Sequence, residues 1–179
     1  MVLLTTQRLK LREFKLTDWP DVYAYESDPA VARYLAYSAS SPHECQSNLD
    51  FLVEHQHEQQ RLIFHLAVVL AREKHLIGTC GLQITNRAVG EAELGYALHS
   101  AYWGHGYMSE AAQAMVNYGF KTLQLRRIFG TCVPDNAASI RVMQKIGMQE
   151  EGHLRENKFI KGQVCDSLFF AILKREWKQ

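Results

Sequence analysis

The chain has 179 residues, 47% of them hydrophobic, which suffices for one domain that buries roughly two-thirds of its unfolded surface. Its 20 basic and 19 acidic side chains leave a formal charge of +1, so no overall field favours nucleic acid or an anionic membrane as a partner. The sequence has neither an apolar run of about 20 residues, as a membrane span needs, nor a signal-peptide pattern. We therefore expect a single cytoplasmic domain over residues 1–179, with no nucleic acid and no membrane as partner.

The first half of the chain carries strand and helix signals in turn. Residues 8–12 alternate polar and apolar side chains, which is typical of a strand with one wet face. Residues 18–60 are expected to form three short helices, because Thr17, Asp28 and Ser41 are candidate N-caps and a proline follows two of them. Further strands are expected over 62–70, 75–84 and 91–98.

The second half begins with a glycine-rich turn and a helix. Met108, Ala111, Ala112, Met115 and Gly119 recur at spacings of three and four, which indicates a helix with one apolar face against the sheet. Beyond it we expect a strand over 127–133, a turn at 134–136, a helix over 137–146 closed by Gly147, a loop tip at 159–162 and a strand over 164–173. This succession of elements predicts an α/β domain around a mixed sheet.

Histidine and cysteine patterns argue against a metal site. The eight histidines form no H-x-x-x-H pair with an acidic neighbour. The cysteines lie far apart and form no C-x-x-C pair. We therefore expect reduced thiols and no metal.

The main chemical signal lies between the strand at 91–98 and the following helix, where residues 103–111 read Trp-Gly-His-Gly-Tyr-Met-Ser-Glu-Ala. Two glycines one residue apart let the backbone turn sharply, so that N–H groups converge at a helix N-terminus, where the helix dipole favours negative charge. A pyrophosphate fits such a turn. The alternative is a glycine-rich turn with no ligand, because Gly-x-Gly before a helix is common.

Three ordered segments together resemble the acetyl-CoA motifs of the GNAT N-acetyltransferases: residues 93–96 (Glu-Leu-Gly-Tyr), residues 103–111, and residues 136–139 (Asn-Ala-Ala-Ser) followed by 145–148 (Lys-Ile-Gly-Met). More narrowly, the chain resembles the RimJ/RimL branch, whose members acetylate the N-termini of ribosomal proteins. A dinucleotide-binding fingerprint is disfavoured, because its third glycine is missing. The Gly-Lys-Ser/Thr of a Walker motif is also absent.

The resemblance implies a fold and a cofactor. The fold would be a single-domain α/β structure with a mixed, mostly antiparallel sheet flanked by helices and a splay between two central strands. The acetyl donor would be acetyl-CoA. The family usually has a small residue where this chain has Met108, so the larger side chain must find room in the first helical turn. The cofactor-binding residues implied are Leu98, Gly104, His105, Gly106, Tyr107, Met108, Ser109, Asn136 and Ser139.

The resemblance also implies catalytic residues, each with a structural alternative. Ser139 would hydrogen-bond the sulfur of CoA as it leaves, or else it only caps or packs near its helix start. Glu93 would accept the amine proton directly or through water, with Glu91 as its rival on the same strand face, or else it is a solvated glutamate. Asn136 would tie its loop to pantetheine or substrate, or else it is an ordinary turn residue. Tyr96 receives no chemical role.

The acceptor is expected to be an amine. An α-amino group has a pKa near 7.7–8.0, against about 10.4 for lysine, so a modest base suits an N-terminal amine. With the branch resembled, this favours a protein or peptide N-terminus. The alternatives are a small amine (polyamine, amino acid or antibiotic) and a catalytically silent acyl-CoA-binding module. We expect the residues around Tyr34, Tyr37 and Phe159 to determine acceptor specificity. The protein is expected to be a monomer or a weak homodimer.

Overall fold

The computed structural model describes residues 1–35 and 41–178, so Tyr37 lies outside the described residues. The strands are β1 (Leu3–Thr5), β2 (Leu9–Arg12), β3 (Ile63–Leu70), β4 (Leu76–Asn86), β5 (Glu91–Leu98), β6 (Arg127–Cys132), β7 (Gln149–Ile160) and β8 (Gln163–Leu173). The helices are η1 (Leu16–Asp18), α1 (Trp19–Glu26), α2 (Pro29–Ala32), α3 (Pro42–His55), η2 (Ser100–Tyr102), α4 (Tyr107–Lys121) and α5 (Ala137–Lys145).

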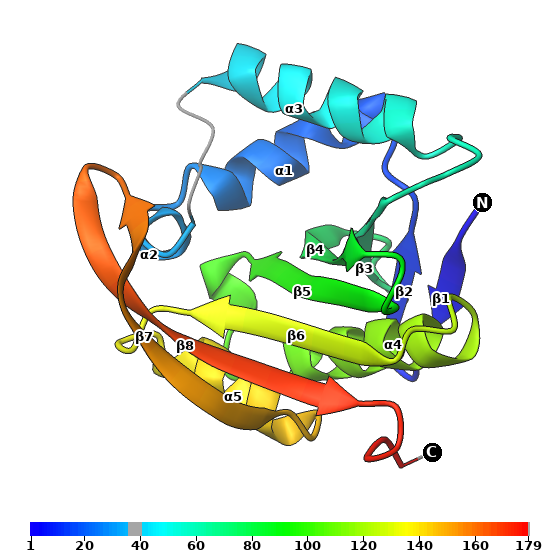
Figure 1. The fold of residues 1–179 in the computed structure, drawn as a ribbon. Helices are drawn as coiled ribbons and strands as arrows, with labels where there is room; N and C mark the ends of the chain where they lie inside the picture. The colour runs from blue at the N-terminus through cyan, green and yellow to red at the C-terminus, as the bar shows by residue number, and fades with distance from the viewer. Residues whose placement is uncertain (36–40, 179) are drawn as a thin grey trace.

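The strands form a sheet in the order β1-β2-β3-β4-β5-β6-β8-β7, in which only the neighbours β5 and β6 are parallel. Figure 1 shows α1 and α3 on one face of this sheet and α4 and α5 on the other. The larger apolar core lies between the sheet and α4 and α5, and a smaller one lies under α1 and α3. The expected α/β fold with a mostly antiparallel sheet flanked by helices is therefore confirmed. No helix in the described part of the chain is long and apolar enough to cross a bilayer.

The splay expected between two central strands lies between β5 and β6. The two strands pair over only three residues each, from Glu91 with Arg127 to Glu93 with Phe129. Beyond Glu93 the strands part, because β5 continues beside β4 while β6 continues beside β8 as far as Cys132. A wedge-shaped opening between neighbouring strands follows from this geometry.

Of the three predicted N-cap residues, two cap a helix in the structure and one does not. The side chains of Asp28 and Ser41 accept hydrogen bonds from the backbone N–H groups of Ala30 and Glu44 at 2.9 and 3.2 Å, as N-caps of α2 and α3. The prediction for Thr17 was wrong. It lies inside η1, and the residue that precedes α1 is Asp18.

Two strands have no counterpart in the sequence prediction, and both lie at an edge of the sheet. β1 has only three residues. β7 is polar and largely exposed along its length, so it lacks the alternating pattern by which half-buried strands are recognised. The loop tip expected at 159–162 is correspondingly shorter, because Phe159 and Ile160 belong to β7 and the turn is formed by Lys161 and Gly162.

One cross-strand row in the middle of the sheet contains two glycines. His65 on β3 pairs with Gly81 on β4, which pairs with Gly95 on β5. A Cβ on Gly81 would lie 2.5 Å from the Cα of His65 and 2.6 Å from its ring. The His65 imidazole therefore occupies the space that a side chain at position 81 would need. The same ring lies 3.8 Å from where a Cβ on Gly95 would be.

Gly81→Ala should lower the free energy of unfolding by about 2–3 kcal/mol, because the added methyl group would overlap the backbone of β3. Urea unfolding measures the effect. The matched control is Gly152→Ala on β7, where a Cβ meets nothing within 4 Å, and there the change should stay within about 0.5 kcal/mol. Equal effects of the two substitutions would contradict this account of the glycine row.

The start of α4 is tied to the N-terminal strands by a carboxylate. Glu110 accepts hydrogen bonds from the Thr6 hydroxyl at 2.6 Å, from the Arg8 backbone N–H at 2.9 Å and from the Arg8 guanidinium at 2.7 Å. Arg8 also donates to the carbonyl of His105 at 3.0 Å. Burial alone raises the pKa of the Glu110 carboxyl, but the hydrogen bonds from Thr6 and Arg8 outweigh it and leave that pKa lowered.

Glu110→Gln should lower the free energy of unfolding at pH 7 by about 1 kcal/mol, because a charged acceptor of three hydrogen bonds becomes a neutral one. A lowered pKa stabilises the fold above the ordinary glutamate pKa of about 4.3, and this contribution is lost as the pH falls through the folded-state value. The difference between variant and wild type should thus narrow below that pH in urea titrations. A pH-independent difference, or an equal effect of Glu54→Gln on the exposed face of α3, would contradict this assignment.

Candidate active site

The glycine-rich turn leads directly into the N-terminus of α4. Gly104 and Gly106 both have φ of 79°, in the left-handed region that favours glycine, and Gly106 is the N-cap of α4. A Cβ on Gly104 would meet nothing within 4 Å, and one on Gly106 would meet only the Arg8 guanidinium, at 3.7 Å. Glycine is required here by backbone conformation and not by crowding, so the space outside the first turn of the helix stays open.

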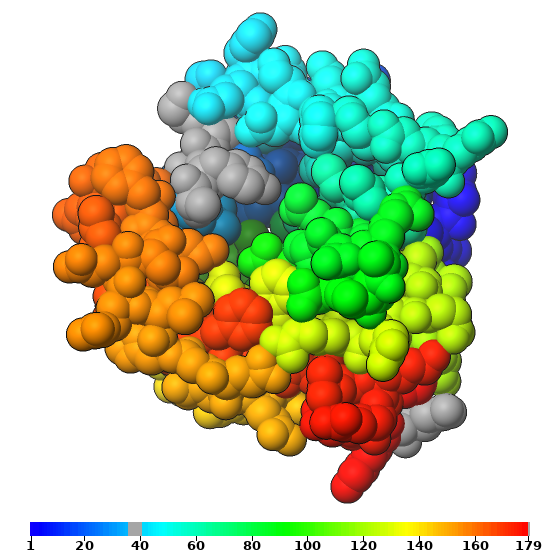
Figure 2. Space-filling view, in the orientation of Figure 1, coloured from blue at the N-terminus to red at the C-terminus, as the bar shows by residue number. Residues whose placement is uncertain are grey.

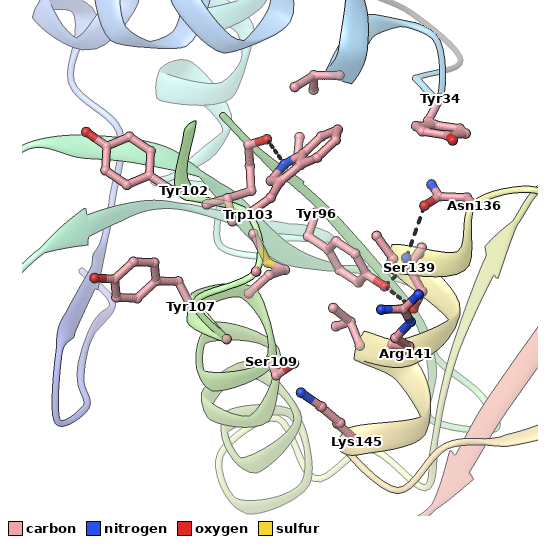
Figure 3. Close-up of a pocket in the computed structure, with 18 of the residues that line it drawn as sticks. Tyr34, Tyr96, Tyr102, Trp103, Tyr107, Ser109, Asn136, Ser139, Arg141 and Lys145 are labelled. Atoms are coloured by element: carbon pink, nitrogen blue, oxygen red, sulfur yellow. Dashed lines mark hydrogen bonds between the residues drawn. The ribbon is translucent and has the colours of Figure 1, made fainter. Parts of the chain in front are cut away.

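A cleft of about 260 Å³ lies between the start of α4, the end of β5 and α5. Figure 3 shows Ser109 on α4 and Lys145 on α5 facing each other across it. Of the cofactor-binding residues implied by the sequence, the cleft is lined by Leu98, Gly104, Gly106, Tyr107, Met108, Ser109, Asn136 and Ser139.

Of the implied residues, His105 lies outside the cleft, whereas Met108 lines it and is mostly buried in the larger core. His105 does not line the cleft; its carbonyl binds Arg8, and its ring nitrogen Nδ1 lies 2.8 Å from the carbonyl of Trp103. Met108 has room, because its side chain is buried in the larger core. Two basic side chains that the sequence analysis did not include, Arg141 and Lys145, also line the cleft. Their spacing of four residues on a predicted helix places them on one helix face, which was a usable signal.

A second cavity of about 450 Å³ lies on the α1 face of the sheet. Figure 2 shows this face hollowed between the β7–β8 hairpin, in orange, and the green strands. Its wall includes Lys158 and Ile160 of the hairpin next to Phe159, which itself is exposed to solvent. The two cavities share the lining residues Tyr34, Leu35, Tyr96, Ala97, Asn136 and Ser139, so they meet at the splay.

Three polar side chains occupy the meeting point of the cavities. Asn136 is the N-cap of α5, and its Oδ1 accepts a hydrogen bond from the Ser139 N–H at 3.0 Å. The Ser139 hydroxyl lies 2.8 Å from the hydroxyl of Tyr96, which also donates to the Ser139 carbonyl at 3.2 Å (Figure 3). Burial raises the pKa of Tyr96, so this phenol is protonated throughout the physiological range. The sequence alone assigns Tyr96 no chemical role.

The two candidate carboxylates on β5 have different surroundings. Glu91 lies opposite Arg127 and accepts a hydrogen bond from its guanidinium at 3.1 Å, and it lines neither cavity. Glu93 lines the second cavity and accepts a weak hydrogen bond from Thr131 at 3.4 Å. The geometry therefore favours Glu93 over Glu91 as a group that faces an acceptor.

Neutral groups complete the second cavity. His65 lies on its floor, where burial and the neighbouring Arg61 lower the pKa of its imidazole to about 4. Burial raises the pKa of the Cys132 thiol to about 11. Neither side chain is charged at pH 7. Within residues 1–35 and 41–178, no group of three histidine, cysteine or acidic side chains is arranged to hold a metal ion.

Comparisons with known proteins agree with this geometry. The family profile of the acetyltransferase (GNAT) domain matches residues 8–149. An uncharacterized N-acetyltransferase of Bacillus licheniformis, p20, is 34% identical over 178 residues, which is 99% of both chains. Spermidine N(1)-acetyltransferase of Escherichia coli is 26% identical over 170 residues, covering 94% of this chain and 88% of the relative.

Solved structures show the same relationship. A GNAT-family acetyltransferase of Bacillus anthracis has a TM-score of 0.86 at 31% identity and covers 98% of this chain and all of its own. The ribosomal-protein-S5-alanine acetyltransferase of Vibrio fischeri has a TM-score of 0.85 at 25% identity, and both chains are covered completely. With the glycine turn, the splay and the cleft in place, the chain belongs to the GNAT family and is an acetyl-CoA-dependent N-acetyltransferase.

Proposed function

We propose that this enzyme acetylates the N-terminal α-amine of a protein or peptide, with residues 1–179 acting as one catalytic domain. The observation that carries the proposal is the junction of the two cavities at the splay, with Asn136 and Ser139 in both and Glu93 on the acceptor side alone. The likeness to the ribosomal-protein-S5-alanine acetyltransferase supports a protein N-terminus as acceptor. An α-amine also has a lower pKa than a lysine side chain, so a carboxylate base can deprotonate it more easily.

The first cleft fits the donor. The open space at the N-terminus of α4 suits a pyrophosphate, whose charge the helix dipole and the cations Arg141 and Lys145 would balance. The backbone N–H groups of Gly106, Tyr107, Met108 and Ser109 would hold it. Acetyl-CoA, when bound, supplies a thioester that an amine attacks and from which the sulfur departs.

The residues at the splay have separate tasks. Glu93 faces the acceptor cavity and accepts the proton of the attacking amine, directly or through water. Ser139 donates a hydrogen bond where charge develops on the departing sulfur. A thiol pKa of about 8.5 means that this hydrogen bond suffices near neutral pH without full proton transfer. Asn136 holds the start of α5, and with it Ser139, through the N-cap hydrogen bond.

A small polyamine is the second candidate acceptor. Glu26 and Glu93 both line the second cavity, and among its described lining residues Lys158 is the cation that opposes them. A wall with two carboxyl groups suits an acceptor that keeps one ammonium group while another reacts. The relative named spermidine N(1)-acetyltransferase supports this alternative.

One assay tests the proposal against this alternative. Release of free CoA thiol from acetyl-CoA is measured with peptides of varied N-terminal residue, with polyamines, and with free amino acids and aminoglycosides. Saturable release with peptides that have a free N-terminus, abolished when that terminus is blocked, supports the proposal. Release with spermidine but with no peptide would replace it by the small-amine function.

Glu93→Gln should lower kcat by about 100-fold or more with the best acceptor, because a general base contributes 10²–10⁴-fold. The matched control is Glu91→Gln, two residues away on the same strand and outside both cavities, which should keep kcat within about threefold. Steady-state kinetics at pH 7 with saturating acetyl-CoA measure both. A full-rate Glu93→Gln variant would show that the proton leaves by another route.

Gly106→Trp should weaken acetyl-CoA binding by at least about tenfold, because an indole at the start of α4 would fill the space in front of the backbone amides. Gly162→Trp is the matched control, since this hairpin glycine also has positive φ and open space around it but lies outside both cavities. Isothermal titration calorimetry gives the two dissociation constants. Equal affinity of the two variants would refute the assignment of the donor site.

A further inference from the structure

Tyr96 is the tyrosine that enters the splay. It lies on β5 beyond Glu93, the last residue of that strand that pairs with β6. Its side chain lines both cavities, and its hydroxyl is 2.8 Å from the Ser139 hydroxyl (Figure 3). The phenol therefore touches the group that the proposed function places at the departing sulfur.

Proton counting limits what these two hydroxyls can do. Each carries one proton. If the serine donates to the tyrosine, its only proton is used and none is left for a ligand. The single Tyr96 proton can reach two acceptors, the Ser139 carbonyl at 3.2 Å and the Ser139 hydroxyl oxygen at 2.8 Å. If it goes to the nearer hydroxyl oxygen, or is shared between the two, the serine proton is free to point into the cleft. Because burial raises the pKa of Tyr96, the phenol keeps its proton at physiological pH and stays able to donate.

We propose that Tyr96 is a positioning residue that donates its hydrogen bond to Ser139 and so orients the serine proton toward the sulfur that leaves. The inference rests on the proposed role of Ser139. In that step the amine nitrogen bonds the acetyl carbon, the carbon–sulfur bond breaks, and its electron pair goes to sulfur, which accepts the Ser139 hydrogen bond. Glu93 receives the amine proton, and Tyr96 keeps its own.

Contacts other than the Tyr96 hydroxyl also hold α5 in place. The N-cap hydrogen bond, in which the Asn136 Oδ1 accepts from the Ser139 N–H, fixes the start of the helix. Met143 and Ile146 are buried in the larger core and fix its remainder. Tyr96→Phe keeps the ring and removes only the donor, so it tests the orientation of Ser139 with little disturbance of the packing.

The experiment is a double-mutant cycle of Tyr96→Phe and Ser139→Ala. Tyr96→Phe should lower kcat about tenfold, as the loss of one hydrogen bond at the reacting group does, with the acetyl-CoA dissociation constant and KM within about twofold of wild type. The double variant should be no slower than Ser139→Ala alone. Tyr118→Phe on α4, outside both cavities, is the control and should leave kcat unchanged.

A second readout uses the free protein. If the two hydroxyls are hydrogen-bonded, the shifts in urea midpoint caused by the two single substitutions should be non-additive in the double variant. The inference would be overturned if the shifts in urea midpoint of the two single variants added up in the double variant. It would also be overturned if their effects on kcat multiplied, or if Tyr96→Phe raised KM and left kcat unchanged. If the wild type releases no thiol with any amine, the proposed function has failed, and the urea cycle still decides whether Tyr96 holds Ser139.

Discussion

The parting of β5 from β6 is the feature on which the rest of the site depends. Parallel pairing stops at Glu93, and each strand then follows a different antiparallel neighbour. The opening connects a cleft at the start of α4 with a cavity on the opposite face of the sheet. A donor and an acceptor can therefore approach from two sides and meet where Tyr96 and Ser139 touch.

Charged side chains are unevenly distributed between the two cavities of this junction, although the chain as a whole is almost neutral. Arg141 and Lys145 line the donor cleft without an acidic residue among its described lining. Glu26, Glu93 and Lys158 line the second cavity. In the proposed function, the cationic side chains lie beside the phosphate-rich donor and the carboxyl groups lie beside the amine acceptor, so local charge placement matters more than net charge.

Much of the fold was predictable because its signals are local. Asp28 and Ser41 cap helices through contacts two or three residues away, and the apolar face of α4 repeats at helical spacing. The edge strand β7 was missed, because a strand exposed on both faces has no alternating pattern to read. Thr17 was mistaken for a cap, because a threonine before a helix looks the same whether it precedes the first turn or lies within it.

The sequence by itself determined most of the elements and the glycine turn, since these depend on neighbours close along the chain, and it predicted most of the residues expected to bind acetyl-CoA that line the first cleft. Only the tertiary structure decided which of two similar carboxylates lines a cavity, because Glu93 lines the second cavity whereas Glu91 lines neither and is held by Arg127, 36 residues away. It also decided the partner of Tyr96, since Ser139 lies 43 residues further on and reaches the phenol only across the splay. Such pairings depend on strand register and on the separation of β5 from β6, which no local pattern encodes.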